Sequence, residues 1–172
     1  MIILRFIILL LTAYLLALFQ SAVTGEILPS WMKPDLMLIL VTYLGISPPL
    51  IRGALLVFFC GLLYETFSGS PFGFFLFTYL SIFFLIKLLA KFLILGETIT
   101  FRIVLVASSV AFQALLMILL PLVVGIFENF SLPDVSWILP QVLMTCAACW
   151  PLFNLFKKLE TLPRVEPSPL ES

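Results

Sequence analysis

The sequence predicts an all-α integral membrane protein built as a six-transmembrane-helix bundle. Three observations predict it: the composition, six apolar runs, and the placement of basic residues between those runs. Hydrophobic residues make up 63% of the chain and charged residues 10%, whereas a soluble domain has about 45–50% and about 25%. The mean hydropathy is +1.25. Because a transmembrane helix needs about 20 residues, six helices nearly exhaust the 172 residues. We expect one membrane domain over 1–158 and a polar tail over 159–172.

The first two runs predict helices over 6–23 and 35–50. The first is longer than the apolar region of a signal peptide, which has about 7–15 residues, so we expect an uncleaved helix. Pro34 precedes the second helix, where a missing N–H costs little. Pro48 and Pro49 are predicted to end it, because the residue before a proline resists the helical conformation.

The next two runs predict helices over 52–67 and 72–95. At about 1.5 Å per residue the third helix would be only ~24 Å long, short of a hydrocarbon core of ~30 Å. The Gly- and Pro-containing stretch after it must be shielded by other helices or reach the interface. The fourth run is rich in Phe, and it carries Lys87 and Lys91 one turn apart near its end.

The last two runs predict helices over 103–127 and 137–156. Gln113 is expected to hydrogen-bond across helices, and Pro121 to kink its helix or end it early. Pro140 falls in the first turn of the sixth helix, where proline is tolerated. Lys157 and Lys158 are expected to close that helix, before a disordered tail.

Basic residues predict the orientation. With the N-terminus inside, eight of the nine Lys and Arg residues fall on the inner side, and Lys33 alone falls outside. The positive-inside rule therefore predicts that both termini are cytoplasmic. The inner residues are Arg5, Arg52, Lys87, Lys91, Arg102, Lys157, Lys158 and Arg164.

The residue inventory argues against enzyme chemistry. Histidine is absent, which removes the commonest general base and metal ligand. No recognisable catalytic motif is present, and a formal net charge of zero gives no reason to expect a nucleic-acid partner. Cys146 and Cys149 have C-x-x-C spacing, but within an apolar run they are expected to serve close helix packing. We expect no catalytic, cofactor or metal site.

Asp35 and Glu65 are predicted near the outer ends of adjacent antiparallel helices. Ionisable groups inside a membrane are functional candidates, so the pair could form a proton or cation site, or serve structure or partner binding. Alternatively, both lie at headgroup level, with Asp35 interacting with its helix dipole and Glu65 solvated.

The segment from Pro34 to Gly73 resembles the bacterial rod shape-determining protein MreD family. That family typically has Pro-Asp followed by a Leu-rich helix, then Gly-Leu-x-x-Asp and Ser-Gly-x-Pro-x-Gly in a chain of similar length. Glu65 stands where the family usually has Asp, so the acid is kept with one more methylene. The matching positions are Pro34, Asp35, Gly61, Glu65, Ser68, Gly69, Pro71 and Gly73.

The resemblance implies a non-enzymatic scaffold or regulatory subunit of the cell-elongation complex, which supports lateral peptidoglycan synthesis and rod shape. It implies a multi-pass protein of the bacterial inner membrane that binds MreC, in a wider complex with MreB, RodA and a class B penicillin-binding protein. It also implies a fold similar to the S-components of energy-coupling-factor vitamin transporters. A small-molecule-binding membrane subunit of that type is therefore the alternative function, and a membrane enzyme acting on a lipid-linked substrate is a third.

Two hypotheses describe how a partner would bind. In the first, Asp35, Glu65 and the turn 68–73 shape an outer recess, which the short third helix leaves open for a partner helix. In the second, both acids are structural and the partner docks on another face.

Overall fold

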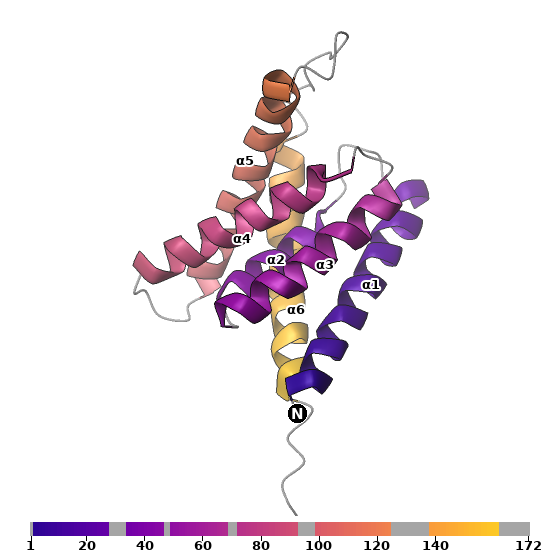
Figure 1. Ribbon diagram of the computed structural model, residues 1–172, viewed down its shortest axis with the longest axis vertical. Helices are drawn as coiled ribbons and strands as arrows, with labels where there is room; N and C mark the ends of the chain where they lie inside the picture. Colours follow the sequence, from indigo (N-terminus) through magenta and orange to yellow (C-terminus); the bar gives the residue numbers. More distant parts are fainter. Residues whose placement is uncertain are drawn as a thin grey trace, which may run out of the picture.

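A computed structural model describes residues 2–27, 34–46, 49–68, 72–92, 99–124 and 138–161 (Figure 1). These residues form six α-helices and short connections, with no strand among them, so the predicted all-α fold is confirmed. Four helices are long and apolar enough to cross a membrane, and they are α3 to α6. The bounds are α1 Ile2–Ile27, α2 Leu36–Ile46, α3 Leu50–Ser68, α4 Phe74–Phe92, α5 Ile99–Val124 and α6 Ile138–Thr161.

The short helix is α2, and the prediction that the third helix is short was wrong. Helix α3 has 19 residues, which corresponds to roughly 28 Å, whereas α2 has 11, or roughly 16 Å. The predicted helix covers 52–67, whereas α3 begins two residues earlier, at Leu50, and continues to Ser68. Helix α2 ends at Ile46, shortly before Pro48 and Pro49, as expected from the steric effect of proline on the residue before it.

Other boundaries also differ from the expected ranges. Helix α1 begins four residues before the predicted start and ends four after the predicted end. Helix α5 continues past Pro121 to Val124, so this proline does not end it early. Lys158 lies in the last turn of α6, as expected, although the helix ends at Thr161, five residues past the predicted end, and Pro140 falls in its first turn. Residues 159–161, expected in the tail, continue α6, and residues 99–102, expected before the fifth helix, begin α5. The rest of the tail, the loop 128–136 and the end of the fourth run lie outside the described residues.

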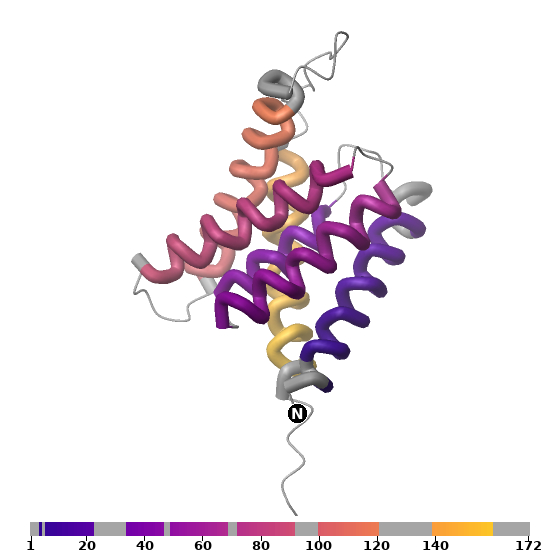
Figure 2. The backbone as a smooth tube through the Cα atoms, in the orientation of Figure 1, coloured from indigo at the N-terminus to yellow at the C-terminus, as the bar shows by residue number. Residues whose placement is uncertain are grey.

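Helix α2 lies at the centre of the bundle. It contacts each of the other five helices, and α3 and α4 run side by side across it (Figure 2). Every residue from Leu36 to Gly45 is buried. Consecutive helices run in alternating directions, so the start of α1 and the end of α6 lie at the same end of the bundle (Figure 1). The core is therefore built around a helix that meets only protein.

Glycines permit the closest helix crossings. A Cβ atom at Gly45 would lie 2.6 Å from the side chain of Ile86, and one at Gly53 2.7 Å from the ring of Phe83. At Gly61 a Cβ would lie 2.8 Å from the backbone Cα of Leu76. Small residues are used in this way where membrane helices approach closely, and here they bring both α2 and α3 against α4.

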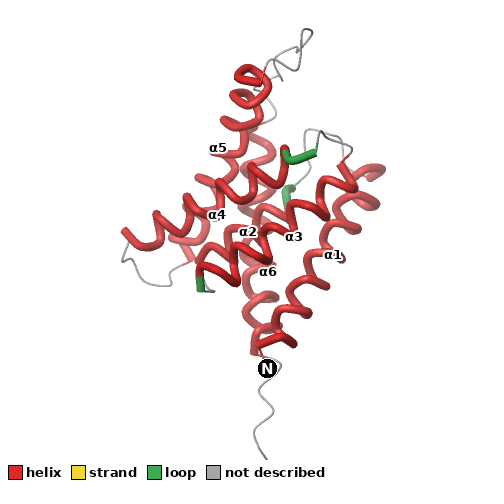
Figure 3. Tube along the Cα trace, in the orientation of Figure 1, coloured by secondary structure: helices red, strands yellow, loops and turns green. Residues whose placement is uncertain are grey.

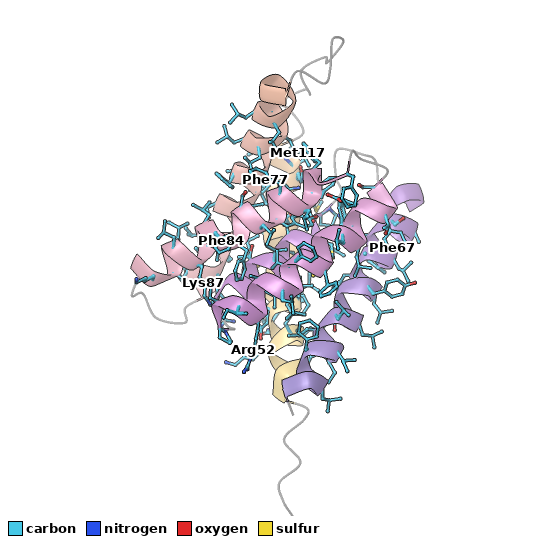
Figure 4. The ribbon with its side chains drawn as sticks, in the orientation of Figure 1. Arg52, Phe67, Phe77, Phe84, Lys87 and Met117 are labelled. Atoms are coloured by element: carbon cyan, nitrogen blue, oxygen red, sulfur yellow. The ribbon has the colours of Figure 1, made fainter. Side chains whose placement is uncertain are left out.

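The outer surface of the bundle is apolar. Phe77 and Phe84 on α4 and Phe67 on α3 are exposed large hydrophobic residues (Figure 4). Arg52 at the start of α3 and Lys87 in α4 lie towards the lower end of the same view. Exposed apolar side chains on helices of this length fit a lipid environment, because the hydrocarbon region offers no hydrogen bonds.

Candidate functional site: a buried polar cluster at the start of α2

The backbone N–H groups at the buried start of α2 need hydrogen-bond acceptors. The first backbone N–H groups of a helix have no partner within the helix, and Leu36, Met37 and Leu38 are buried. Neither water nor lipid can therefore satisfy them, and a buried unpaired N–H costs about 1–3 kcal/mol. Side chains from elsewhere in the bundle must supply the acceptors.

Gln20 and Asp35 supply these acceptors. Oε1 of Gln20, on α1, accepts from the N–H groups of Leu36 at 3.1 Å and Met37 at 3.3 Å. Oδ1 of Asp35 accepts from the Leu38 N–H at 3.0 Å, which makes Asp35 the N-cap of α2. The first intrahelical bond follows, from the Ile39 N–H to the Asp35 carbonyl.

Two further helices hold Asp35 itself. Its N–H donates to Oγ1 of Thr145 on α6 at 3.2 Å, and its Oδ2 accepts from Nε2 of Gln113 on α5 at 2.8 Å. The side chain is only 3% exposed. Asp35 is therefore enclosed by protein, and its interaction with the start of α2 is as expected. The cross-helix hydrogen bond predicted for Gln113 is confirmed.

Two tyrosines complete the cluster. Nε2 of Gln20 donates to the hydroxyl of Tyr64, on α3, at 3.2 Å. The Tyr64 ring packs against Tyr79, on α4, with centroids 5.6 Å apart. We call the six residues the polar cluster, and each belongs to, or directly precedes, a different helix: Gln20, Asp35, Tyr64, Tyr79, Gln113 and Thr145.

Glu65 forms a second junction at the same end of the bundle. Its Oε1 accepts from the N–H of Leu76 in the first turn of α4 at 2.9 Å, and the side chain is 6% exposed. The expectation that Glu65 is solvated was therefore wrong. The connections before α2 and α4 both lie in the upper half of the view in Figure 3. The two acids thus lie at the same end of the bundle, but each caps a different helix.

The remaining residues of the MreD-like segment lie around these junctions. Pro34 is partly buried directly before the capping Asp35, and Ser68 is the exposed last residue of α3. Gly61 lies one turn before Glu65, at the α3–α4 crossing. Gly73 has φ of +91°, a backbone conformation that glycine adopts without strain, and its carbonyl accepts the first helical bond of α4. Gly69 and Pro71 lie outside the described residues.

Sequence reasoning missed four members of the polar cluster: Gln20, Tyr64, Tyr79 and Thr145. The signal that found Gln113, an uncharged polar side chain within an apolar run, applies equally to Gln20. Nothing in the sequence shows that these side chains converge on Asp35, because the convergence depends on how the helices pack.

The cysteines pack within the bundle. Cys149 is buried in the core and Cys146 packs partly against it. Both carry free thiols, as does Cys60. Among the described residues no group of three or more Cys, Asp or Glu side chains is arranged to hold a metal ion.

Comparison of the chain with protein-family models, with curated proteins and with solved structures finds no match in any of the three. A function is therefore proposed from the geometry of the site and from the sequence pattern.

Proposed function

We propose that this chain is a non-enzymatic membrane scaffold of the MreD type, which binds MreC in the bacterial inner membrane and supports cell elongation and rod shape. The observation that carries the proposal is the MreD-like segment from Pro34 to Gly73. Four apolar helices of spanning length support the membrane location. All six helices would cross the membrane in the proposed arrangement.

The contacts of this segment support a scaffold. Asp35 caps α2, Glu65 caps α4, and Gly61 lets α3 approach α4 closely. These residues fix where three helices begin, end and cross. A protein that holds a partner helix needs a rigid surface, because lipid supplies no hydrophobic driving force and association depends on close packing and polar contacts.

The second docking hypothesis fits these contacts better than the first. The capping oxygens of Asp35 and Glu65 are engaged with backbone N–H groups within the bundle, and both side chains are buried. The first hypothesis depends on a short third helix that leaves a recess at its end, but α3 has 19 residues. We infer that both acids are structural and that MreC docks on another face of the bundle.

Co-purification tests the proposal. The tagged chain is expressed with MreC from the same genome and isolated in mild detergent, and MreC is expected to elute with it at a fixed ratio. A matched control is the same preparation with an unrelated six-helix membrane protein as bait. Failure of MreC to elute with a monodisperse, helical chain would contradict the scaffold function.

The variant Glu65→Gln separates the two docking hypotheses. Glutamine keeps the acceptor that caps α4 but removes the charge, so the fold should persist, and we expect MreC to be retained. Loss of MreC with an unchanged helical content and melting temperature would show that the carboxylate contacts the partner.

A further inference from the structure

A basic side chain lies at the junction where α5 begins and α6 approaches its end. Arg102, in the first turn of α5, places its guanidinium carbon 5.5 Å from the centroid of the Phe153 ring on α6. That ring is 3% exposed, and it packs edge-on against Tyr43 of α2 with centroids 5.4 Å apart. Because a cation is attracted to the face of an aromatic ring, Arg102 is held against a well-packed part of the core.

Two lysines extend this basic group along α6. Lys157 lies one turn after Phe153, and residues four apart share a face of a helix. Lys158 follows it, and both lysines are exposed. We call Arg102, Lys157 and Lys158 the basic junction. The sequences of α5 and α6 contain one acidic residue, Glu160, so three cations and one acid leave these two helices with a net positive charge.

The length of α6 sets the depth of the basic junction in a membrane. The helix rises over nineteen residues from Ile138 to Lys157, which is roughly 28 Å and close to the hydrocarbon thickness of about 30 Å. A crossing by α6 therefore places Lys157 at the edge of the hydrocarbon core, where lipid phosphates lie. Phe153, with the Arg102 guanidinium beside it, lies one turn further in.

We propose that the basic junction binds the headgroup of one anionic phospholipid, in the leaflet that this end of the bundle faces. The planar guanidinium of Arg102 matches the oxygens of a phosphate in a two-pronged contact, and Lys157 adds a point charge. Basic sites between membrane helices bind anionic headgroups in this way. Val104 on α5 and Leu155 on α6 are exposed, and they offer an apolar surface to the acyl chains of the same lipid.

A soluble anion fits the basic junction less well. It would have to enter the headgroup layer and displace lipid phosphates that are already at the depth of Lys157, and it would make no contact with Val104 or Leu155. The lipid site rests on the membrane location of the chain and on the contact between α5 and α6. It is independent of MreC, so it stands or fails separately from the scaffold function.

Lipid retention by the purified full chain tests the site. Native mass spectrometry after exposure to equal amounts of phosphatidylglycerol and phosphatidylcholine should show preferential retention of phosphatidylglycerol. A basic residue near an anionic lipid surface contributes roughly a fivefold gain in binding, so Arg102→Gln and Lys157→Gln should each weaken phosphatidylglycerol binding about fivefold. Equal retention of the two lipids by the wild type, or unchanged binding in either variant, overturns the proposal.

Arg52→Gln is the matched control, because it removes the same charge from a different helix. Arg52 is exposed at the start of α3, which packs against α1, α2 and α4, and it lies towards the lower end of the view in Figure 4. Its substitution should leave phosphatidylglycerol binding unchanged. A loss equal to that of Arg102→Gln would show a general attraction of basic residues to anionic lipid, and it would overturn a site at the α5–α6 junction.

Two measurements on the wild-type chain remain decisive if a variant does not fold. Phosphatidylglycerol that carries a photoreactive group near its headgroup should form adducts at the start of α5 and the end of α6, and adducts absent from both segments overturn the site. Phosphatidylglycerol should also raise the melting temperature, whereas inorganic phosphate at the same concentration should not. An equal rise with both overturns the lipid assignment in favour of a soluble anion.

Discussion

At the scale of single residues, helix caps made by two acidic side chains help to hold this bundle together. Asp35 caps α2 and Glu65 caps α4, and in both cases the accepted N–H belongs to a first turn that lies inside the bundle. Each acid also benefits from the positive end of the helix dipole. In each acid one carboxylate oxygen caps a helix; the second oxygen of Asp35 accepts from Gln113, and the second oxygen of Glu65 is buried without a partner among the described residues.

Gln20 gives the sharpest test at this scale, because one side chain satisfies two backbone N–H groups from another helix. Gln20→Leu should lower the free energy of unfolding by about 2 kcal/mol, since the N–H groups of Leu36 and Met37 would be left buried and unpaired. The measurement is equilibrium unfolding in mixed micelles, followed by circular dichroism.

Thr12→Ala is the control on the same helix. The Thr12 hydroxyl bonds only to the Ile8 carbonyl one turn earlier, so its removal should change the free energy of unfolding by less than about 0.5 kcal/mol. Equal effects of the two substitutions would mean that Gln20 does not secure the start of α2.

At the scale of elements, the backbones of α3 and α4 approach each other closely at Gly61. A Cβ at Gly61 would lie 2.8 Å from the Leu76 Cα atom, and the N–H of the same Leu76 binds Glu65 one turn further along α3. The close approach and the cap are therefore coupled: if the helices separate at Gly61, Glu65 loses its reach to α4.

Gly61→Ala should therefore lower the free energy of unfolding by about 1–3 kcal/mol, the usual cost of overpacking. It should also speed hydrogen exchange of the Leu76 amide. Gly53→Ala is the matched control, because its added Cβ meets the Phe83 ring rather than a backbone Cα. It should cost less and leave Leu76 exchange unchanged. Faster exchange in both variants, or in neither, would contradict the coupling.

At the scale of the whole molecule, the apolar runs predict the six helices correctly, but they do not predict how long each helix is. The third apolar run is bounded by Arg52 and Ser68, and it predicts a helix over 52–67. Glu65 lies inside both the predicted and the observed range, and it is buried because its carboxylate caps α4. Helix α2 is shorter than its run because proline limits its end and Asp35, outside the helix, caps its start.

The candidate site could be predicted only in part, because its contacts depend on how the helices pack. Asp35 and Gln113 stand out as polar residues at the start of an apolar run or within one. Their partnership is a tertiary contact between residues 78 positions apart. Tyr64 and Tyr79 give no sequence signal, because tyrosine is common in apolar helices near interfaces. The sequence predicts which polar residues need hydrogen-bond partners. It does not predict which partners they bind.

The number of helices that cross the membrane is the last question at this scale. Helix α2, at 11 residues, is too short to span alone, since a span needs about 20. Its side chains and its capped start are nevertheless enclosed by the other five helices, so it does not have to meet lipid. We therefore expect six crossings, with the basic residues gathered on the cytoplasmic side.

Reporter insertions within the intact chain distinguish six crossings from four. With α3 to α6 spanning alone, positions 30 and 165 would lie on the same side of the membrane; with six crossings they lie on opposite sides. We expect alkaline phosphatase to be active when inserted at 30 and at 131, and a fluorescent protein to fold only at 96 and at 165. The insertions at 96 and 131 are controls, because both arrangements place them alike. An inactive phosphatase at 30, with the expected results at 96, 131 and 165, would mean that α1 and α2 do not each cross the membrane.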